Sequence, residues 1–418
     1  MDKMIVSGGR ALRGEVRVSG AKNSALPILF STILAEGAHK FTNLPNLKDI
    51  ESTAELLASL GCICSRDGDI FSVTNKGINN FEAHYDLVRK MRASILCLGP
   101  LLARYGEAVV SMPGGCAIGS RPIDLHLDSM KALGAEIELR EGYVMAKAKR
   151  LKGARILFES VTVGGTENLM MAATLAEGKT LIENAAKEPE IVDLAEYLIS
   201  MGAKISGHGS SIIEIDGVEK LRAAEHRIIP DRIEAGTLLI AAAITHGDVT
   251  IQDCRPDHLE ALLLKLKECG FQMQIGKTDI HIASQKTWKA VDITTAPFPL
   301  FPTDLQAQYM ALMTAAEGTS VISETVFENR FMHVQELIRL GADISPKTRV
   351  AVVRGVKPGG LTGAPVMATD LRASACLVLA GLAAHGDTLI NRIYHLDRGY
   401  EKLETKLSHL GGKINRVS

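Results

Sequence analysis

The stretch NSALPILFSTILAEG, residues 23–37, is an apolar run that ends in a small residue, an acid and a glycine. Five similar runs follow it along the chain. The glycines that close the six runs are 69, 72, 69, 71 and 68 residues apart: Gly37, Gly106, Gly178, Gly247, Gly318 and Gly386. Self-similarity at a fixed period is the signature of a repeat architecture, so the sequence predicts six copies of a unit of about 70 residues.

Each copy also contains a second, more amphipathic helix, which ends in a hydrophobic residue or a cysteine followed by a glycine. These closing glycines suit a left-handed helix C-cap, and they are Gly61, Gly134, Gly202, Gly270, Gly341 and Gly411. Alternating segments with a turn signal, such as EIELREGYVMA, follow most of these helices and predict strand pairs. We expect the first helix of each copy to be fully buried and the second to be half exposed.

The sixth copy is incomplete, because it ends in GGKINRVS with one strand and no return strand. The chain begins with KMIVSGG, residues 3–9, a strand that has no local partner. We therefore predict that the N-terminus completes the last copy. The two domains would then be residues 20–229, and residues 230–418 with residues 1–19, each with three copies.

The composition of the chain limits the classes of function and partner that are open to it. The 418 residues are 46% hydrophobic, enough for two cores, and the formal charge of −1 gives no global field for nucleic acid or a membrane surface. Seven cysteines without a dense framework suit free thiols in a reducing cytoplasm. The apolar run at residues 24–35 is too short to span a bilayer.

Basic residues stand where helices begin, although acids are favoured at helix N-termini. Each of them has an inert alternative, such as pairing of Arg232 with Asp231 or of Arg372 with Asp370. The recurrence of the pattern indicates instead a polyanionic ligand held between helix ends. The bases are Lys22, Arg92, Arg121, Arg232, Arg330, Arg372 and Arg398.

One cysteine differs from the others. Cys116 lies in PGGCAIGSRPIDLH, residues 113–126, where glycines exclude regular structure and the cationic helix start at Arg121 favours a thiolate. A reactive and an inert role are equally compatible with these features. His126 is interpreted as structural, and zinc is not expected because Cys62 and Cys64 lack ligand spacing. Packing explains the remaining six cysteines: Cys62, Cys64, Cys97, Cys254, Cys269 and Cys376.

Several segments together resemble the enolpyruvyl transferases over essentially the whole chain: SGAKNSALP, PGGCAIGSRPIDLH, PDRIEAGT, FPTDLQAQ, ATDLRASA and YHLDRGYEKLE. The resemblance implies an α/β (α+β) fold, a two-domain inside-out barrel of six repeats with helices inside and sheets outside. It also implies an active site in the interdomain cleft, phosphoenolpyruvate and UDP-N-acetylglucosamine as anionic substrates, and no metal or cofactor. Neither nucleic acid nor a membrane is an expected partner.

The implied reaction is addition followed by elimination, in which the enolpyruvyl group moves to the sugar 3-hydroxyl and phosphate leaves. By resemblance, Asp304 takes the hydroxyl proton and Cys116 protonates C3 of phosphoenolpyruvate. Cys116 is also the thiol that fosfomycin alkylates in the family. The residues implied for phosphoenolpyruvate are Lys22, Asn23, Arg121, Arg330, Asp370, Arg372 and Arg398, of which Lys22 and Arg398 are also placed among the catalytic residues.

The nucleotide sugar is assigned to a second set of residues by the same resemblance. The set is Asn23, Arg92, Arg121, Pro122, Ile123, Asp124, Leu125, Val161, Thr162, Val163, Gly164, Asp304 and Val326. Ser160 stands where some relatives have a lysine that contacts the nucleotide. Two alternatives stay open: transfer to shikimate 3-phosphate, against which the Cys116 loop argues, and a non-catalytic paralogue that binds nucleotide sugars.

Overall fold

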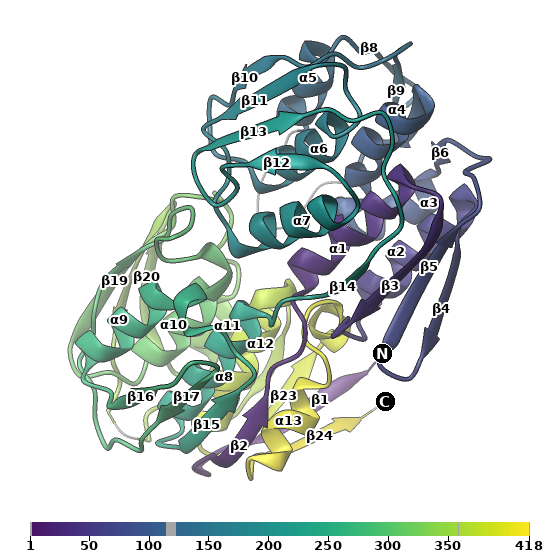
Figure 1. The fold of residues 1–418 in the computed structure, drawn as a ribbon. Helices are drawn as coiled ribbons and strands as arrows, with labels where there is room; N and C mark the ends of the chain where they lie inside the picture. The colour runs from purple at the N-terminus through teal and green to yellow at the C-terminus, as the bar shows by residue number, and fades with distance from the viewer. Residues whose placement is uncertain (1, 114–122, 358, 418) are drawn as a thin grey trace. The chain divides into compact units, whose positions relative to one another are not determined.

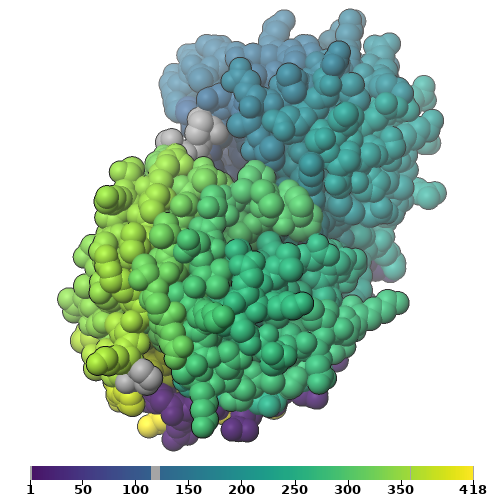
Figure 2. Space-filling model, turned by 90° about the vertical axis from the view of Figure 1, so that its left-hand side faces the viewer, coloured from purple at the N-terminus to yellow at the C-terminus, as the bar shows by residue number. Residues whose placement is uncertain are grey.

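The computed structural model describes residues 2–113, 123–357 and 359–417, and these fall into two compact units. The N-terminal unit consists of residues 20–113 and 123–229. The C-terminal unit consists of residues 2–19, 230–357 and 359–417. Purple side chains of the first residues lie among the green and yellow ones of the C-terminal unit in the space-filling view (Figure 2). Each unit has its own hydrophobic core.

Three four-stranded sheets belong to the N-terminal unit (Figure 1). Their strands are β3 (Gly37–Thr42), β4 (Ile63–Asp67), β5 (Ile70–Asn75), β6 (Glu82–Ala83), β7 (Glu107–Ser111), β8 (Glu136–Arg140), β9 (Tyr143–Lys147), β10 (Arg155–Leu157), β11 (Lys179–Glu183), β12 (Lys204–Ser206), β13 (Ile212–Asp216) and β14 (Glu225–Arg227). The strand orders are β14–β3–β5–β4, β6–β7–β9–β8 and β10–β11–β13–β12.

The C-terminal unit repeats this arrangement. Its strands are β1 (Lys3–Ser7), β2 (Arg13–Arg17), β15 (Asp248–Gln252), β16 (Met273–Ile275), β17 (Asp279–Ile282), β18 (Ile293–Thr294), β19 (Thr319–Ser323), β20 (Asp343–Lys347), β21 (Val350–Arg354), β22 (Pro365–Met367), β23 (Asp387–Asn391) and β24 (Lys413–Val417). They form sheets in the orders β16–β17–β15–β2, β18–β19–β21–β20 and β22–β23–β1–β24.

The pairing of β1 confirms the prediction for the chain's N-terminus. β1 lies between β23 and β24 and is antiparallel to both, with Met4 opposite Ile390 and Arg416. It therefore supplies the return strand that the sixth repeat lacks. Two other repeats are also completed by strands that are distant in sequence. β14 pairs in parallel with β3 of the first repeat, and β2 pairs in parallel with β15 of the fourth repeat.

The first helices of the repeats form the centre of each unit and are almost entirely buried, as predicted. In the C-terminal unit, α8, α10 and α12 pack against one another between the three sheets (Figure 1). These helices are α1 (Lys22–Ser31), α4 (Leu98–Tyr105), α6 (Val163–Ala173), α8 (Arg232–Ile244), α10 (Gln306–Met313) and α12 (Leu371–Ala383).

Three of the apolar runs are not continuous α-helices. They contain the 3₁₀ segments η1 (Thr32–Leu34), η2 (Arg92–Cys97) and η4 (Thr303–Leu305). In the second repeat the reason is Pro100, which cannot donate a hydrogen bond to the carbonyl of Leu96 and so separates η2 from α4.

The second helices end as predicted, because all six closing glycines have φ between 91° and 116°. These helices are α2 (Lys48–Leu60), α5 (Asp124–Ala132), α7 (Pro189–Ser200), α9 (Glu260–Cys269), α11 (Val334–Arg339) and α13 (Leu403–His409). The sequence pattern DRGYEKLETKLSHLG predicts that the sixth begins at Asp397, but the helix begins at Leu403, after η5 (Ile393–Arg398). α7 is also more buried than expected. Two short helical segments, α3 (Tyr85–Val88) and η3 (Pro256–His258), complete the described structure.

Candidate functional site

Asp304 is the centre of an ion-pair cluster in the C-terminal unit. It lies in η4, at the start of the first helix of the fifth repeat. Its Oδ1 accepts a hydrogen bond from Nη2 of Arg330 at 2.9 Å, and its Oδ2 accepts one from Nη2 of Arg372 at 2.7 Å. Both guanidinium groups are buried, whereas the carboxylate is partly exposed. Two predicted cations thus fix the orientation of the predicted base.

The bond to Asp304 uses only one nitrogen of the Arg372 guanidinium group. Its Nε and Nη1 are buried and have no hydrogen-bond partner among the described residues. Burial lowers the pKa of Arg372, but the attraction of Asp304 and other nearby groups outweighs burial, so the net effect is a raised pKa and a permanent charge. A buried guanidinium with unused N–H groups is suited to an anionic ligand.

Asp370 and Arg398 belong to the same electrostatic environment. Asp370 caps α12, because its Oδ1 accepts hydrogen bonds from the backbone N–H groups of Arg372 at 2.8 Å and Ala373 at 3.1 Å. Burial, helped by Arg398, lowers the pKa of His395, and Asp370 opposes this shift. The pKa of His333 is lowered to about 4, first by burial and then by Arg330.

The N-terminal unit places a different set of groups at its helix starts. Lys22 opens α1, is nearly buried, and bonds through Nζ to Oδ2 of Asp49 at 3.3 Å. Asn23 beside it and Arg92 at the start of η2 are half-buried. Burial raises the pKa of Glu167 well above its ordinary value, and the carboxylates of Glu190 and Glu188 raise it further. Besides these bases, this unit therefore holds a buried acid close to two further acids.

The segment predicted for the nucleotide sugar surrounds the start of α6. Thr162 caps this helix, with its Oγ1 accepting a hydrogen bond from the N–H of Gly165 at 3.2 Å. Gly164 faces the His126 ring, and a Cβ there would be 3.2 Å from it. The remaining described members comprise Ile123, which is buried; Leu125 and Val161, which are half-buried; and Asp124, Val163 and, in the C-terminal unit, Val326, which are exposed.

His126 is buried, and its Nδ1 accepts a hydrogen bond from Nδ2 of Asn168 at 3.1 Å. This contact fits the predicted structural role. Three predicted site residues, Cys116, Arg121 and Pro122, lie outside the described residues. The other six cysteines are free thiols, as predicted, and burial raises the pKa of Cys97 to about 12.

Arg372 does not pair with its local acid in the way that the simple alternative assumes. The side chain of Arg372 bonds to Asp304 in the neighbouring repeat, while Asp370 serves as the helix cap. Arg232 stacks over the Phe298 ring, with its guanidinium carbon 5.5 Å from the ring centroid. Asp231, like Asp370, is an N-cap, since its Oδ1 accepts from the N–H groups of Ile233 and Glu234.

Sequence reasoning missed three buried residues: Gln308, which bonds to the backbone of Asp304, and Thr237 and Tyr400, which bond to Gln308. A signal for such contacts was present. Asp304 and Arg372 are 68 residues apart and Gln308 and Thr237 are 71 apart, which are the spacings between successive copies. Equivalent positions of adjacent repeats therefore meet in the centre of the unit.

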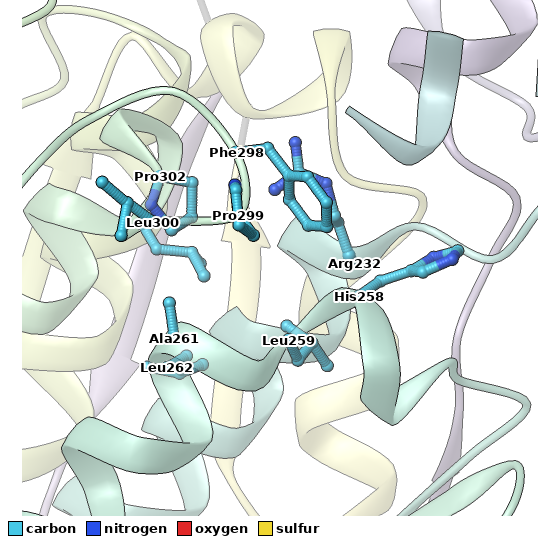
Figure 3. A pocket seen from close by; sticks show the side chains of 10 residues that line it. Arg232, His258, Leu259, Ala261, Leu262, Phe298, Pro299, Leu300 and Pro302 are labelled. Atoms are coloured by element: carbon cyan, nitrogen blue, oxygen red, sulfur yellow. The ribbon is translucent and has the colours of Figure 1, made fainter. Parts of the chain in front are cut away.

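Two hollows of the surface lie away from this cluster. A narrow pocket lined by Arg232, His258 and Phe298 (Figure 3) has a volume of about 10 Å³, which is room for about one water molecule. A wider hollow of about 510 Å³ in the N-terminal unit is lined by Arg104, Lys149 and other residues outside the predicted site. Within the described ranges, no cluster of three His, Cys, Asp or Glu side chains is suited to a metal. No helix in that part of the chain has the length and apolarity to cross a membrane.

Comparison with known proteins gives a consistent result. Residues 6–407 match the family described as EPSP synthase (3-phosphoshikimate 1-carboxyvinyltransferase). A UDP-N-acetylglucosamine 1-carboxyvinyltransferase of Bdellovibrio bacteriovorus is 71% identical over 99% of this chain and 100% of its own length. One from Thermodesulfovibrio yellowstonii is 57% identical over the full length of both chains.

Two solved structures share the fold. The enolpyruvyl transferase NikO from Streptomyces tendae superposes with a TM-score of 0.90 at 27% identity, over 100% of this chain and 99% of its own. EPSP synthase from Acinetobacter baumannii superposes over 100% of both chains with a TM-score of 0.78, and its 19% identity supports the fold alone. The predicted fold class, a two-domain α/β fold with internal helices, is confirmed.

Proposed function

This chain belongs to the family of enolpyruvyl transferases that includes EPSP synthase, and we propose that it transfers the enolpyruvyl group of phosphoenolpyruvate to the 3-hydroxyl of UDP-N-acetylglucosamine. Phosphate is the second product. The full-length identity of 71% to an enzyme named for that activity supports the choice of acceptor. The observation that carries the chemistry is the Asp304 carboxylate held between two buried arginines.

In the proposed first step, Asp304 accepts the proton of the sugar 3-hydroxyl while the oxygen forms a bond to C2 of phosphoenolpyruvate. Cys116 gives a proton to C3, which completes the addition. In the second step C3 loses a proton, the double bond to C2 forms, and the bond from C2 to the phosphate oxygen breaks. The contacts of Arg330 and Arg372 with Asp304 support this role, because they leave the carboxylate one orientation.

The cations of both units are assigned to the anionic groups of phosphoenolpyruvate. We place Lys22, Arg121 and Arg398 on its phosphate and carboxylate, with Asn23, Arg330, Asp370 and Arg372 beside them. The unused Nε and Nη1 donors of Arg372 support this assignment. Stabilisation of the charged tetrahedral intermediate by such fixed donors is expected to be the largest contribution of the protein.

The nucleotide sugar is assigned to the residues named for it above, which lie mainly around the starts of α5 and α6. The same proposal includes fosfomycin as a covalent inhibitor at Cys116, no cofactor beyond the co-substrate phosphoenolpyruvate, and a cytoplasmic location. The product would enter peptidoglycan synthesis at its first committed step.

The test is to identify the product. With phosphoenolpyruvate and UDP-N-acetylglucosamine, mass spectrometry should find the nucleotide sugar enlarged by one enolpyruvyl group, and treatment with fosfomycin should abolish this product and add mass at Cys116. A Cys62→Ser variant is the control for labelling, since Cys62 is a buried thiol whose pKa burial raises to about 12. Product formed only from shikimate 3-phosphate would replace the proposed acceptor, and tight nucleotide-sugar binding without product would indicate a non-catalytic paralogue.

A further inference from the structure

A buried chain of hydroxyl and amide groups lies behind Asp304 in the C-terminal unit. Tyr400, which follows η5, is 2% exposed. Its hydroxyl is 3.0 Å from Oγ1 of Thr237 on α8 and 3.0 Å from Nε2 of Gln308 on α10. Nε2 of Gln308 is also 2.9 Å from the backbone carbonyl oxygen of Asp304. Groups from three successive repeats therefore meet at this point.

The donor and the acceptor of each hydrogen bond in this network can be assigned by counting the available hydrogens. The Thr237 hydroxyl donates to the carbonyl of Ile233 at 2.7 Å, so its oxygen accepts from the single proton of Tyr400. Gln308 has two amide hydrogens, which it gives to the Asp304 carbonyl and to the two hydroxyl oxygens, with Oγ1 of Thr237 at 3.1 Å. The hydrogen bonds therefore run in two directions from the Gln308 amide: one ends on the backbone carbonyl of Asp304, and the other runs through Tyr400 and Thr237 to the carbonyl of Ile233.

Tyr400 also reaches the side chain of Asp304 by a second route. The guanidinium carbon of Arg372 is 5.4 Å from the centroid of the Tyr400 ring, and Arg372 donates to Oδ2 of Asp304 at 2.7 Å. Burial raises the pKa of Tyr400, although Arg372 lowers it, so the hydroxyl keeps the proton that it donates. One buried side chain therefore constrains both the backbone and the carboxylate of Asp304.

We propose that Tyr400 is a positioning residue for the enolpyruvyl transfer, which fixes Asp304 through Gln308 and through Arg372 without touching the substrates. This inference rests on the proposed function. A displacement of about 1 Å in a catalytic group can cost about 10²-fold in rate, so a residue that fixes two groups at once has a measurable effect on turnover.

The test compares two tyrosine variants of the same unit. Tyr400→Phe keeps the ring over Arg372 but removes the hydroxyl from the hydrogen-bond network. Tyr309→Phe is the matched control, because Tyr309 on α10 is fully buried and its hydroxyl donates to the carbonyl of Val291 at 3.1 Å, away from Asp304 and Arg372. Each variant loses one buried hydroxyl, so their stabilities should fall by similar amounts.

The activities should differ. Tyr400→Phe should lower kcat by about 10-fold while the KM for the nucleotide sugar stays within about 2-fold. Tyr309→Phe should keep kcat within about 2-fold of the wild type. Gln308→Met should reproduce the loss of kcat, since it removes the amide that joins Tyr400 to Asp304. Full kcat in Tyr400→Phe, or an equal loss in Tyr309→Phe, would overturn the inference.

A second measurement, which does not depend on activity, tests the positioning of Asp304 if the proposed function is wrong. If the wild type turns over neither acceptor, that function is wrong, and the positioning of Asp304 is judged from crystal structures of the wild type and Tyr400→Phe. The inference expects the contact between Nε2 of Gln308 and the backbone carbonyl oxygen of Asp304, 2.9 Å here, to be lost in the variant. An unchanged contact would contradict it.

Discussion

The two units have the same sheets and the same order of helices, yet the starts of their first helices differ in charge. In the C-terminal unit, aspartates cap α8 and α12, and two buried arginines hold Asp304. In the N-terminal unit, α1 begins with Lys22 and no side-chain cap, while Glu167 is buried near Glu188 and Glu190. The repeat therefore fixes the backbone, and a few residues at each helix start decide the chemistry.

The largest effect is expected for Asp304, the group on which the difference between the units depends. Asp304→Asn keeps the shape of the side chain but removes the base, so phosphate release should fall by about 10³-fold. Stopped-flow or steady-state phosphate assays measure this directly. Asp343→Asn is the control, since Asp343 pairs with Arg354 at the surface of the same unit. Activity within about 10-fold of the wild type would remove Asp304 from the role of base.

A smaller loss is expected when the buried guanidinium of Arg372 is replaced. Arg372→Lys keeps one charge but loses the planar fork that reaches Asp304 and leaves donors for a ligand, so kcat/KM for phosphoenolpyruvate should fall by about 10²-fold. Arg354→Lys changes an exposed pair of the same type and should have little effect. Equal effects of the two substitutions would show that burial and geometry at Arg372 do not matter.

The buried acids of the N-terminal unit predict a dependence of stability on pH. The pKa of Glu167 in the folded protein lies above its ordinary 4.5, so the folded state binds a proton that the unfolded state has lost. Stability should therefore fall as pH rises above 4.5, by up to about 1.4 kcal/mol per pH unit for this group. Glu167→Gln should flatten this dependence in denaturant unfolding measured between pH 5 and about pH 8.

His333 provides the opposite case in the C-terminal unit. Its pKa is lowered from 6.5 to about 4 by burial, so the unfolded state binds the extra proton in this range and stability should fall as pH drops below 6.5. Hydrogen exchange resolved along the chain can assign the two trends to the two units. An effect of Glu167→Gln on the C-terminal unit alone would contradict the assignment.

The smallest effect concerns a helix cap. Thr162→Ala removes the hydrogen bond from the N–H of Gly165 and should destabilise the N-terminal unit by about 1 kcal/mol. Thr162→Ser retains the hydroxyl and should be nearly neutral. Thermal unfolding of both variants measures the difference, and equal stabilities would mean that this cap contributes nothing to α6.

The fold was largely predictable because the apolar runs and closing glycines recur at nearly constant spacing. The incomplete last repeat also located the partner of β1. The start of α13 was not predictable, since the charged segment before it has a helical pattern but joins η5. Local patterns do not encode contacts between repeats, which is why the roles of Gln308 and Tyr400 were missed.

The site was predictable in part. Asp304, Arg330 and Arg372 were singled out from helix starts and family resemblance, and the structure joins them directly. The exchange of partners was not predictable from neighbouring residues: Asp370 bonds to backbone N–H groups, and the Arg372 side chain bonds to a residue 68 positions away. Knowledge that equivalent positions of adjacent repeats meet would have supplied that pairing.

The central claim is tested most directly by phosphate release from phosphoenolpyruvate, measured with UDP-N-acetylglucosamine and, in parallel, with shikimate 3-phosphate. The account predicts rapid release with the nucleotide sugar and none above background with the other acceptor. Release only with shikimate 3-phosphate, or with neither acceptor, would contradict it.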